Sequence, residues 1–132
     1  MRKILFRGKT EKFGNWIEGN LIVGRDLESG QLIYLIAPLS AYYTEVKKVI
    51  PETVGQYTGL TDKNGKKIFE GDILRFAYNE EDKDPKIYSV EWKSDRACFG
   101  YAETADKMLE IDTFHWEVIG NIHDNPEVSG GE

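Results

Sequence analysis

Two acidic residues separated by one glycine, Glu70 and Asp72, form the first pair in this sequence that could do chemistry. On a β-strand, a spacing of two places both carboxylates on one face, where they could act as acid and base or bind a metal ion. The alternative is structural, since an aspartate that follows a glycine at the start of a strand often accepts backbone N–H bonds from the preceding turn. Acidic residues two apart are common in a chain that is 30% charged, so the structural interpretation is favoured.

The two histidines are the next candidates, because His115 could meet Asp112 and His123 could meet Asp124 to form a metal or general-base cluster. Their separation of eight residues matches no metal-site signature. On one strand they would lie about 26 Å apart, which is too far to share a metal ion. We expect His115 to flank the end of a strand, and His123 to lie in a turn with Asp124 and Asn125.

Other catalytic patterns are absent from the sequence. Cys98 is the single cysteine, so it can form no intramolecular disulfide, and we expect it to be a buried, inert thiol. No Gly-x-Ser-x-Gly motif, glycine-rich phosphate loop or dinucleotide fingerprint is present. We therefore expect no catalytic residues, cofactor or bound metal, and the enzyme alternative is a metal-assisted hydrolase that uses Glu70, Asp72 and one histidine.

A basic patch surrounds a turn signal at Asn64-Gly65 and consists of Lys63, Lys66 and Lys67. These lysines could contact phosphate or an acidic protein surface, although lysines also keep exposed hairpin tips soluble. The formal charge of −6 opposes a phosphate backbone, so nucleic-acid binding is the less favoured alternative. Three tyrosines near turns could add to a binding surface, and they are Tyr42, Tyr43 and Tyr57.

The elements that position these residues are short β-strands, because two-residue alternation and turn residues recur along most of the chain. We expect strands at 4–6, 16–23, 32–36, 46–50, 54–57, 68–78, 88–92, 99–101 and 116–122. Asn64-Gly65 predicts a type I′ hairpin turn, in which both residues have positive φ. Gly71-Asp72 begins a stretch whose alternation places Leu74, Phe76 and Tyr78 on one face.

Between the last strands, the acidic segment 79–85 predicts a solvated loop, and Glu103 to Ile111 is the one credible helix, with Thr104 as its cap. A chain of 132 residues fits a single domain or two sub-lobes at about 1–50 and 51–126, followed by a flexible tail at 127–132. The apolar run near the N-terminus is too short for a signal peptide or a membrane span. With its single cysteine, the chain suits a reducing cytoplasm.

Three segments, in this order, resemble the YopX-like proteins of phages and prophages. They are MRKILFRGKTEKFGNWIEGNLI, ETVGQYTGLTDKNGKKIFEGDIL and EVIGNIHDNPEV. The middle segment is the most specific, and Gly120-Asn121 belongs to the last. The resemblance implies a mainly β fold with compact barrel-like parts, a phage or prophage origin and a bacterial cytoplasm as location, and it implies no reaction, cofactor or catalytic residue.

The sequence thus predicts a mainly β protein with short antiparallel strands, at most one or two short helices and an SH3-like barrel-type architecture. We expect a non-enzymatic accessory protein that binds a host or phage protein, with self-association left open and no membrane association. Its structural motif residues are Asn64, Gly65, Gly71, Asp72, Gly120 and Asn121. Its candidate interaction surface consists of Tyr57, Lys63, Lys66 and Lys67.

Overall fold

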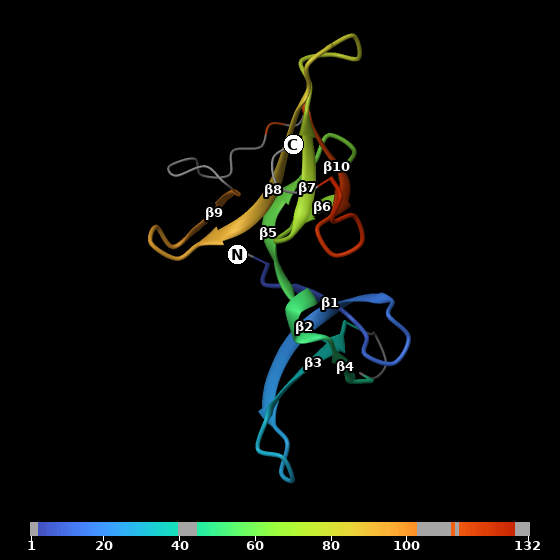
Figure 1. Cartoon of the computed structure of the whole chain (residues 1–132), viewed down its shortest axis with the longest axis vertical. Coiled ribbons are helices and arrows are strands. Elements are labelled where there is room, and N and C mark those ends of the chain that lie inside the picture. The colour runs from blue at the N-terminus through green and yellow to red at the C-terminus, as the bar shows by residue number, and fades with distance from the viewer. Residues whose placement is uncertain (1–2, 40–44, 103–111, 113, 129–132) are drawn as a thin grey trace. The chain divides into compact units, whose positions relative to one another are not determined.

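The fold was analysed in a computed structural model, which describes residues 3–39, 45–102, 112 and 114–128. The chain divides into two compact units, Met1–Tyr57 and Thr58–Glu132, which we call unit 1 and unit 2. Figure 1 shows the strands of each unit and draws in grey the residues that lie outside the described ones. Whether the units act as one domain stays a prediction.

Ten strands and one short 3₁₀ helix make up the described fold. Unit 1 holds β1 (Phe6–Lys9), β2 (Trp16–Arg25), β3 (Leu32–Pro38), β4 (Lys47–Val49) and the 3₁₀ helix η1 (Pro51–Thr53). The strand β5 (Gly55–Thr61) leads from unit 1 into unit 2. Unit 2 continues with β6 (Lys67–Phe69), β7 (Asp72–Phe76), β8 (Lys86–Lys93), β9 (Cys98–Tyr101) and β10 (Trp116–Asn121). The predicted mainly β, antiparallel fold is therefore confirmed.

The strands of unit 1 belong to a six-stranded sheet in the order β4-β3-β2-β1-β5-β6, with β4 at one edge as its β-branched sequence and following proline predict. Its interior contains Ile36 and Val49, both fully buried. A side chain at Gly19, on β2, would approach the backbone carbonyl carbon of Ala37 to 2.6 Å. The glycine thereby permits close contact with β3.

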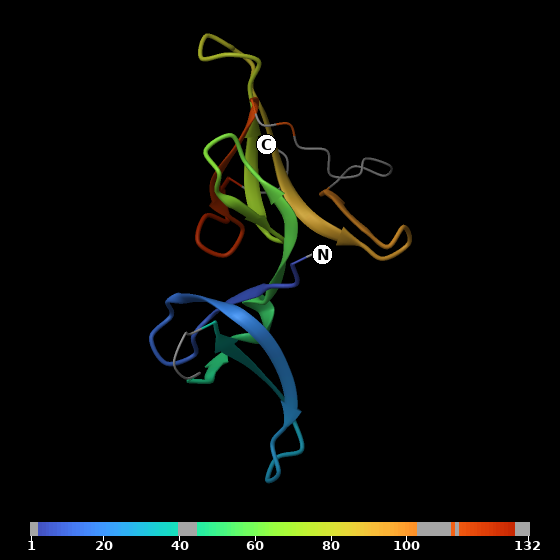
Figure 2. The same ribbon diagram turned by 180° about the vertical axis from the view of Figure 1, so that it is seen from behind.

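The far half of the β2–β3 hairpin is a two-stranded ribbon, because β4 pairs only with Tyr34 to Ile36 of β3 and β1 only with the first residues of β2. Both views show this ribbon extending to its tip (Figures 1 and 2). Ile22, Val23 and Leu32 on the ribbon are each about half exposed. Asp26 closes the tip by accepting N–H bonds from the residues that follow it.

Unit 2 contains a four-stranded antiparallel sheet in the order β10-β7-β8-β9. One face of this sheet supplies a buried cluster of Leu74, Val90, Tyr101 and Trp116, completed by Ile68 of β6. The predicted alternation on β7, β8 and β10 is thus the pattern that builds the core. The register of β10 on β7 shifts between Val118 and Gly120, so the strand does not alternate regularly to its end.

The hairpin between β5 and β6 closes differently from the prediction. Gly65 has φ +79°, whereas Asn64 is not among the described residues with positive φ, so the type I′ assignment is wrong. Gly65 N–H donates to the Asp62 carbonyl over 3.0 Å, and Asp62 N–H donates to the Lys66 carbonyl over 2.8 Å. These bonds are those of a three-residue loop in which a type I turn is followed by one left-handed residue.

The predicted strand 68–78 is interrupted by a turn at Glu70 and Gly71, where Gly71 has φ +92°. Glu70 and Asp72 therefore do not face the same way from one strand, and the premise of a paired carboxylate site is wrong. β6 and β7 also belong to different sheets. The turn carries the chain from one sheet to the other.

Neither sheet closes on itself within the described residues, so the SH3-like barrel-type architecture stays a prediction. The predicted helix from Glu103 to Ile111, as well as Tyr42 and Tyr43, lies outside those residues. In the part of the chain that the structure describes, no helix is long and apolar enough to cross a membrane.

Candidate functional site

The outer end of the core face of unit 2 is hollowed into a cavity of about 250 Å³. Five aromatic side chains and one lysine line it, from all four strands of the sheet and the loop after β7, and we call them the aromatic cup. They are Phe76, Tyr78, Lys86, Tyr88, Tyr101 and Trp116. The cross-strand register explains the gathering, since Phe76 of β7 lies opposite both Trp116 of β10 and Lys86 of β8.

The aromatic rings are packed against one another in well-defined geometries. Tyr101 and Trp116 are stacked with an interplanar angle of 12° and centroids 5.2 Å apart, and they form the buried floor. Tyr88 lies 4.9 Å from Tyr101, and Phe76 lies 5.0 Å from Trp116, both with tilted rings. Such aromatic contacts each stabilise a fold by about 0.5–1.5 kcal/mol beyond the burial of their area, so they stabilise the floor of the cup.

The cup is open to solvent because the side chains on one face of β7 become more exposed toward the end of the strand. Leu74 is fully buried, Phe76 is half-buried, and Tyr78, just beyond the strand, is 73% exposed. Tyr78 meets Phe76 edge to face, with centroids 5.0 Å apart. Contiguous exposed apolar surface, rather than a single exposed side chain, is what marks an interaction site, and Tyr78 adds its ring to the neighbouring rings of the cup.

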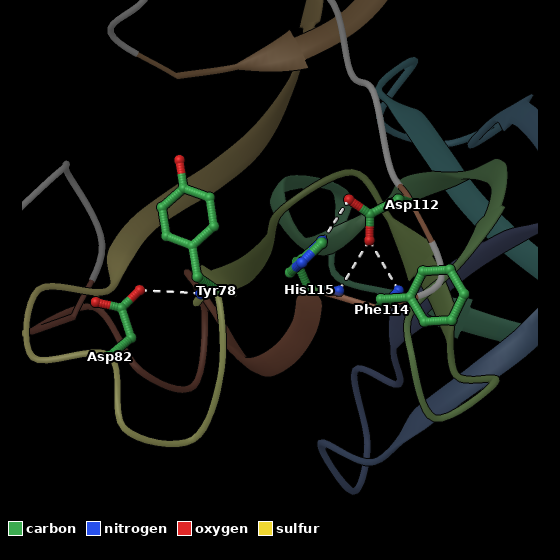
Figure 3. A network of polar contacts seen from close by, with 5 residues as sticks. All are labelled: Tyr78, Asp82, Asp112, Phe114 and His115. Carbon is green, nitrogen blue, oxygen red and sulfur yellow. Dashed lines mark hydrogen bonds and ion pairs between the residues drawn. The ribbon is translucent and has the colours of Figure 1, made fainter.

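Two aspartates hold the rim residues in place (Figure 3). Asp82 accepts the backbone N–H bond of Tyr78 over 3.0 Å. Asp112 accepts the backbone N–H bonds of Phe114 and His115, each over 2.8 Å, and its second oxygen lies 2.9 Å from Nδ1 of His115. The His115 ring in turn lies 6.1 Å from the ring of Tyr78, centroid to centroid.

These contacts favour the ionised form of both aspartates. The hydrogen bond with the His115 ring, followed by the N–H of Phe114, lowers the pKa of the Asp112 carboxyl. The N–H groups of Tyr78 and Asp84 lower the pKa of Asp82, and the positive charges of Arg75 and Lys86 also lower it. Lys86 is paired with Asp84 over 2.8 Å, and this carboxylate raises the pKa of the lysine.

Charge is divided unevenly along the chain, and the cup lies in its acidic part. Residues 58–132 carry seventeen acidic and nine basic side chains, whereas residues 1–57 carry six acidic and eight basic ones. The loop between β7 and β8, which contains Asp82 and Asp84, extends from the ends of these strands (Figure 1). A basic ligand would therefore be attracted to the cup and an anionic one repelled.

The carboxylates and histidines considered from sequence are not gathered into a centre. Asp72 is 1% exposed, and its Oδ2 accepts the N–H of Phe69 over 2.8 Å, which is the structural role that its position after a glycine suggests. His123 lies beside Gly71, whose added Cβ would be 3.5 Å from the histidine Nε2. Within the described residues, no three side chains of His, Cys, Asp or Glu are placed to hold a metal ion.

The predicted interaction surface is dispersed. Lys63 and Lys66 lie exposed on the three-residue hairpin, Lys67 begins β6, and Tyr57 lies in the part of β5 that belongs to unit 1. None of these four residues lines the aromatic cup. Cys98 is half-buried at the start of β9, so the prediction of a buried thiol is only partly met.

Asp62 is a structural residue that the sequence did not single out. It is 3% exposed, and its carboxylate accepts N–H bonds from Asn64, Lys66 and Val118, each over 2.9 Å. Burial acts to raise the pKa of this carboxyl, but the three donors outweigh it and leave the pKa lowered. The first two bonds close the hairpin loop and the third ties the loop to β10.

The predicted motif Gly120-Asn121 begins a loop that closes on itself. Asn121 Oδ1 accepts the N–H groups of His123 and Asp124, over 3.0 and 2.9 Å, and His123 thus lies in the expected turn. Asn125 Oδ1 accepts the N–H of Asn121 over 3.2 Å. A Cβ at Gly120 would lie only 2.9 Å from Cγ of Asn125, so the glycine makes room for this amide.

A second hollow, of about 580 Å³, lies in unit 1 beside Phe13 and Val46. Four of its charged side chains form two ion pairs, since Lys47 meets Glu45 over 3.0 Å and Lys48 meets Glu11 over 3.5 Å. One of its lining residues, Glu45, directly follows residues 40–44, which lie outside the described part of the chain. The aromatic cup, whose named lining residues gather aromatic rings from one sheet, is therefore the candidate site.

Comparisons with known proteins identify the family of the chain and a similar structure. A family model described as YopX protein matches residues 5–128, which is nearly the whole sequence. No curated protein matches the chain. Among solved structures, it is similar to the crystal structure of protein EF1440 from Enterococcus faecalis, with 25% identity and a TM-score of 0.60. This match covers 96% of the present chain and 98% of the other. The resemblance predicted from the three sequence segments is thus confirmed, and the chain belongs to the YopX family.

Proposed function

We propose that this protein is a non-enzymatic accessory protein, encoded by a phage or prophage, that binds another protein in the cytoplasm of a bacterial host. The observation that carries the proposal is the aromatic cup, in which the exposed Tyr78 stands over a floor of buried rings. Exposed aromatic side chains beside a fixed pocket supply much of the binding energy in protein interfaces. Membership of the YopX family is in keeping with the proposed phage or prophage origin, and the similar solved structure is that of a bacterial protein.

The strand order β10-β7-β8-β9 supports an SH3-like barrel-type architecture for unit 2, in which β7, β8 and β9 form a meander. Folds of this kind host many functions, so the architecture alone does not identify a partner. The proposal depends on the exposed aromatic site rather than on the fold.

The hydrolase alternative has little geometric support. The Asp72 carboxylate is buried and accepts a backbone N–H, and Glu70 lies in the turn rather than on the same strand face. A general acid or base must reach the proton that it transfers, which a buried and already bonded carboxylate does not do. The nucleic-acid alternative relies on three lysines of a unit whose acidic residues outnumber its basic ones.

The test is a comparison of two single variants in one capture experiment. Wild type, Tyr78→Ala and Phe13→Ala are immobilised and exposed to lysate from phage-infected host cells. Phe13 is the matched control because it is 77% exposed, much like Tyr78, but lies in unit 1. A recovered protein is then purified and titrated against each variant by calorimetry.

We expect one stoichiometric partner that binds wild type and Phe13→Ala equally and binds Tyr78→Ala at least about tenfold more weakly, as for an interface anchor. A partner that binds all three proteins with the same affinity would show that the cup is not the binding site. Recovery of no stoichiometric protein would count against the protein-binding function itself.

A further inference from the structure

The shape, chemistry and charge of the cup define a class of ligand. We propose that the aromatic cup binds an extended, proline-rich peptide segment whose arginine or lysine side chains lie against Asp82 and Asp112. This inference rests on the proposed protein-binding function and names the chemistry of the partner.

The cavity is small and its ends are open. Its volume of about 250 Å³ is below the usual range of 300–1,000 Å³ for sites that enclose a whole small molecule. Tyr78, on one wall, is 73% exposed, so a ligand in the cup remains in contact with solvent on that side. The space fits one or two compact side chains of a longer chain that continues past the rim.

Aromatic rings supply most of the side chains that line the cup. Proline rings are flat, apolar and compact, and segments rich in proline hold an extended helix without internal hydrogen bonds. Such segments dock in aromatic-lined grooves at a low cost in conformational entropy, because their conformation is already formed. The stacked floor of Tyr101 and Trp116 and the tilted rings of Phe76 and Tyr88 provide a groove of this chemistry.

The backbone beside the cup is already bonded. The N–H of Ala77 donates to the carbonyl of His115 over 3.2 Å, and the N–H of Tyr78 donates to Asp82. The N–H groups of Phe114 and His115 both donate to Asp112. A ligand that added a strand here would need these donors, whereas a proline-rich segment is bound through side-chain surfaces.

The charge of the rim selects a basic segment. Asp82 accepts the backbone N–H of Tyr78, and Asp112 is bonded to the ring of His115, which lies 6.1 Å from the ring of Tyr78. Both carboxylates are therefore outside the cup but within a residue or two of its exposed wall. The cation that lines the cup, Lys86, is neutralised by Asp84 at 2.8 Å. A lysine in the lining disfavours a bare cation inside the cup, so the basic groups of the ligand belong at the rim and its apolar rings inside.

Three synthetic peptides of equal length separate these requirements. The first repeats Pro-Pro-Arg, the second repeats Gly-Ser-Arg with the same charge but no proline, and the third repeats Pro-Pro-Glu with the charge reversed. Each is titrated into wild type, Tyr78→Ala and Phe13→Ala, with chemical shifts of the aromatic protons as the readout.

We expect the Pro-Pro-Arg peptide to bind wild type and Phe13→Ala alike, and to lose about tenfold or more in affinity for Tyr78→Ala. Its affinity for wild type should fall as salt is raised, because the rim contacts are exposed charge pairs. Both other peptides should bind at least about tenfold more weakly than the first, since each lacks one recognised group.

Other outcomes overturn the inference in identifiable ways. Equal binding of the Pro-Pro-Arg and Gly-Ser-Arg peptides would mean that the site responds to charge and not to proline. Binding of Pro-Pro-Arg that Tyr78→Ala leaves unchanged would place the peptide elsewhere. If no peptide binds, yet a lysate partner is lost with Tyr78→Ala, the ligand class is wrong and the protein-binding function stands. If both experiments fail, the protein-binding function is wrong as well.

Discussion

The carboxylate of Asp62 accepts the backbone N–H of Val118 over 2.9 Å, although the two residues are 56 positions apart in the sequence. Lys63, the next residue, donates its own N–H to the carbonyl of Trp116 over 2.9 Å. The hairpin after β5 is therefore attached to β10 by two consecutive residues, through the side chain of Asp62 and the backbone N–H of Lys63. Because Trp116 is part of the cup floor, this attachment helps to hold the binding surface.

Asp62→Asn should lower the free energy of unfolding at neutral pH by about 1–3 kcal/mol, the usual cost of breaking a buried, charge-assisted hydrogen-bond set. An amide would direct an NH₂ group toward at least one of the three N–H donors. Urea denaturation measures the loss. Asp84→Asn is the control, because the Asp84 side chain is 85% exposed and its loss should change stability by no more than about 0.5 kcal/mol.

The same carboxylate gives a pH dependence with a defined sign. The pKa of Asp62 is lower in the folded protein than its ordinary value of 3.8, so its contribution to stability is fully present above that value. The contribution is lost as the pH falls through the folded pKa. The stability difference between wild type and Asp62→Asn should therefore narrow below about pH 4, and a difference that stays constant to pH 2 would contradict this assignment.

Gly65→Val should destabilise the protein by about 1–3 kcal/mol, because a β-branched residue is strained at φ +79°. An added Cβ at this position meets no atom within 4 Å, so the loss measures backbone strain alone. Gly65→Asn is the matched variant, since asparagine tolerates the left-handed region, and it should cost less than half as much. Equal losses in the two variants would refute the left-handed geometry of this turn.

The positions of most strands along the chain, and the faces of several, could be predicted from sequence because short-range alternation indicates which side chains are buried. Leu74, Phe76 and Tyr78 share the predicted face, and so do Tyr88 and Val90 on β8. The type I′ turn failed because Asn-Gly is also compatible with a three-residue loop, and the side chain of Asp62, by accepting the N–H of Lys66, favours the longer closure. No local sequence pattern indicates that the Asp62 carboxylate accepts the N–H of Lys66 and also the N–H of Val118 on β10.

The cup was not predictable for a related reason. Its five aromatic residues were all assigned to strands, but alternation alone does not tell where the core stops and solvent begins along a face. Tyr78 and Leu74 have the same parity in the sequence, yet one is 73% exposed and the other is fully buried. The cross-strand register, which brings Trp116 opposite Phe76, is a long-range property of the fold.

Gly120→Ala should destabilise unit 2 by about 1–3 kcal/mol, because its Cβ would displace the Asn125 amide that accepts the N–H of Asn121. The loss should be smaller in an Asn125→Ala background, where the crowding amide is absent. A double-mutant cycle in urea measures this coupling. Strictly additive losses would mean that the two positions do not share space.

The hairpin lysines should not confer nucleic-acid binding. We expect wild type and the triple variant Lys63→Ala, Lys66→Ala and Lys67→Ala to pass through a heparin column at low salt, because acidic residues outnumber basic ones in unit 2. A basic protein of similar size serves as the positive control. Retention of wild type that the triple variant loses would favour the nucleic-acid alternative instead.

Two substitutions in the cup should separate stability from binding. Trp116→Ala should lower the free energy of unfolding by about 3–5 kcal/mol, because this ring is 7% exposed and packs against Phe76, Tyr88 and Tyr101. Tyr78→Ala should change it by no more than about 0.5 kcal/mol, since the side chain is mostly in solvent. Urea denaturation of both variants, read by circular dichroism, gives the two values. A large loss of stability in Tyr78→Ala would make this tyrosine a structural residue, and weaker partner binding by that variant could then no longer be attributed to the cup surface.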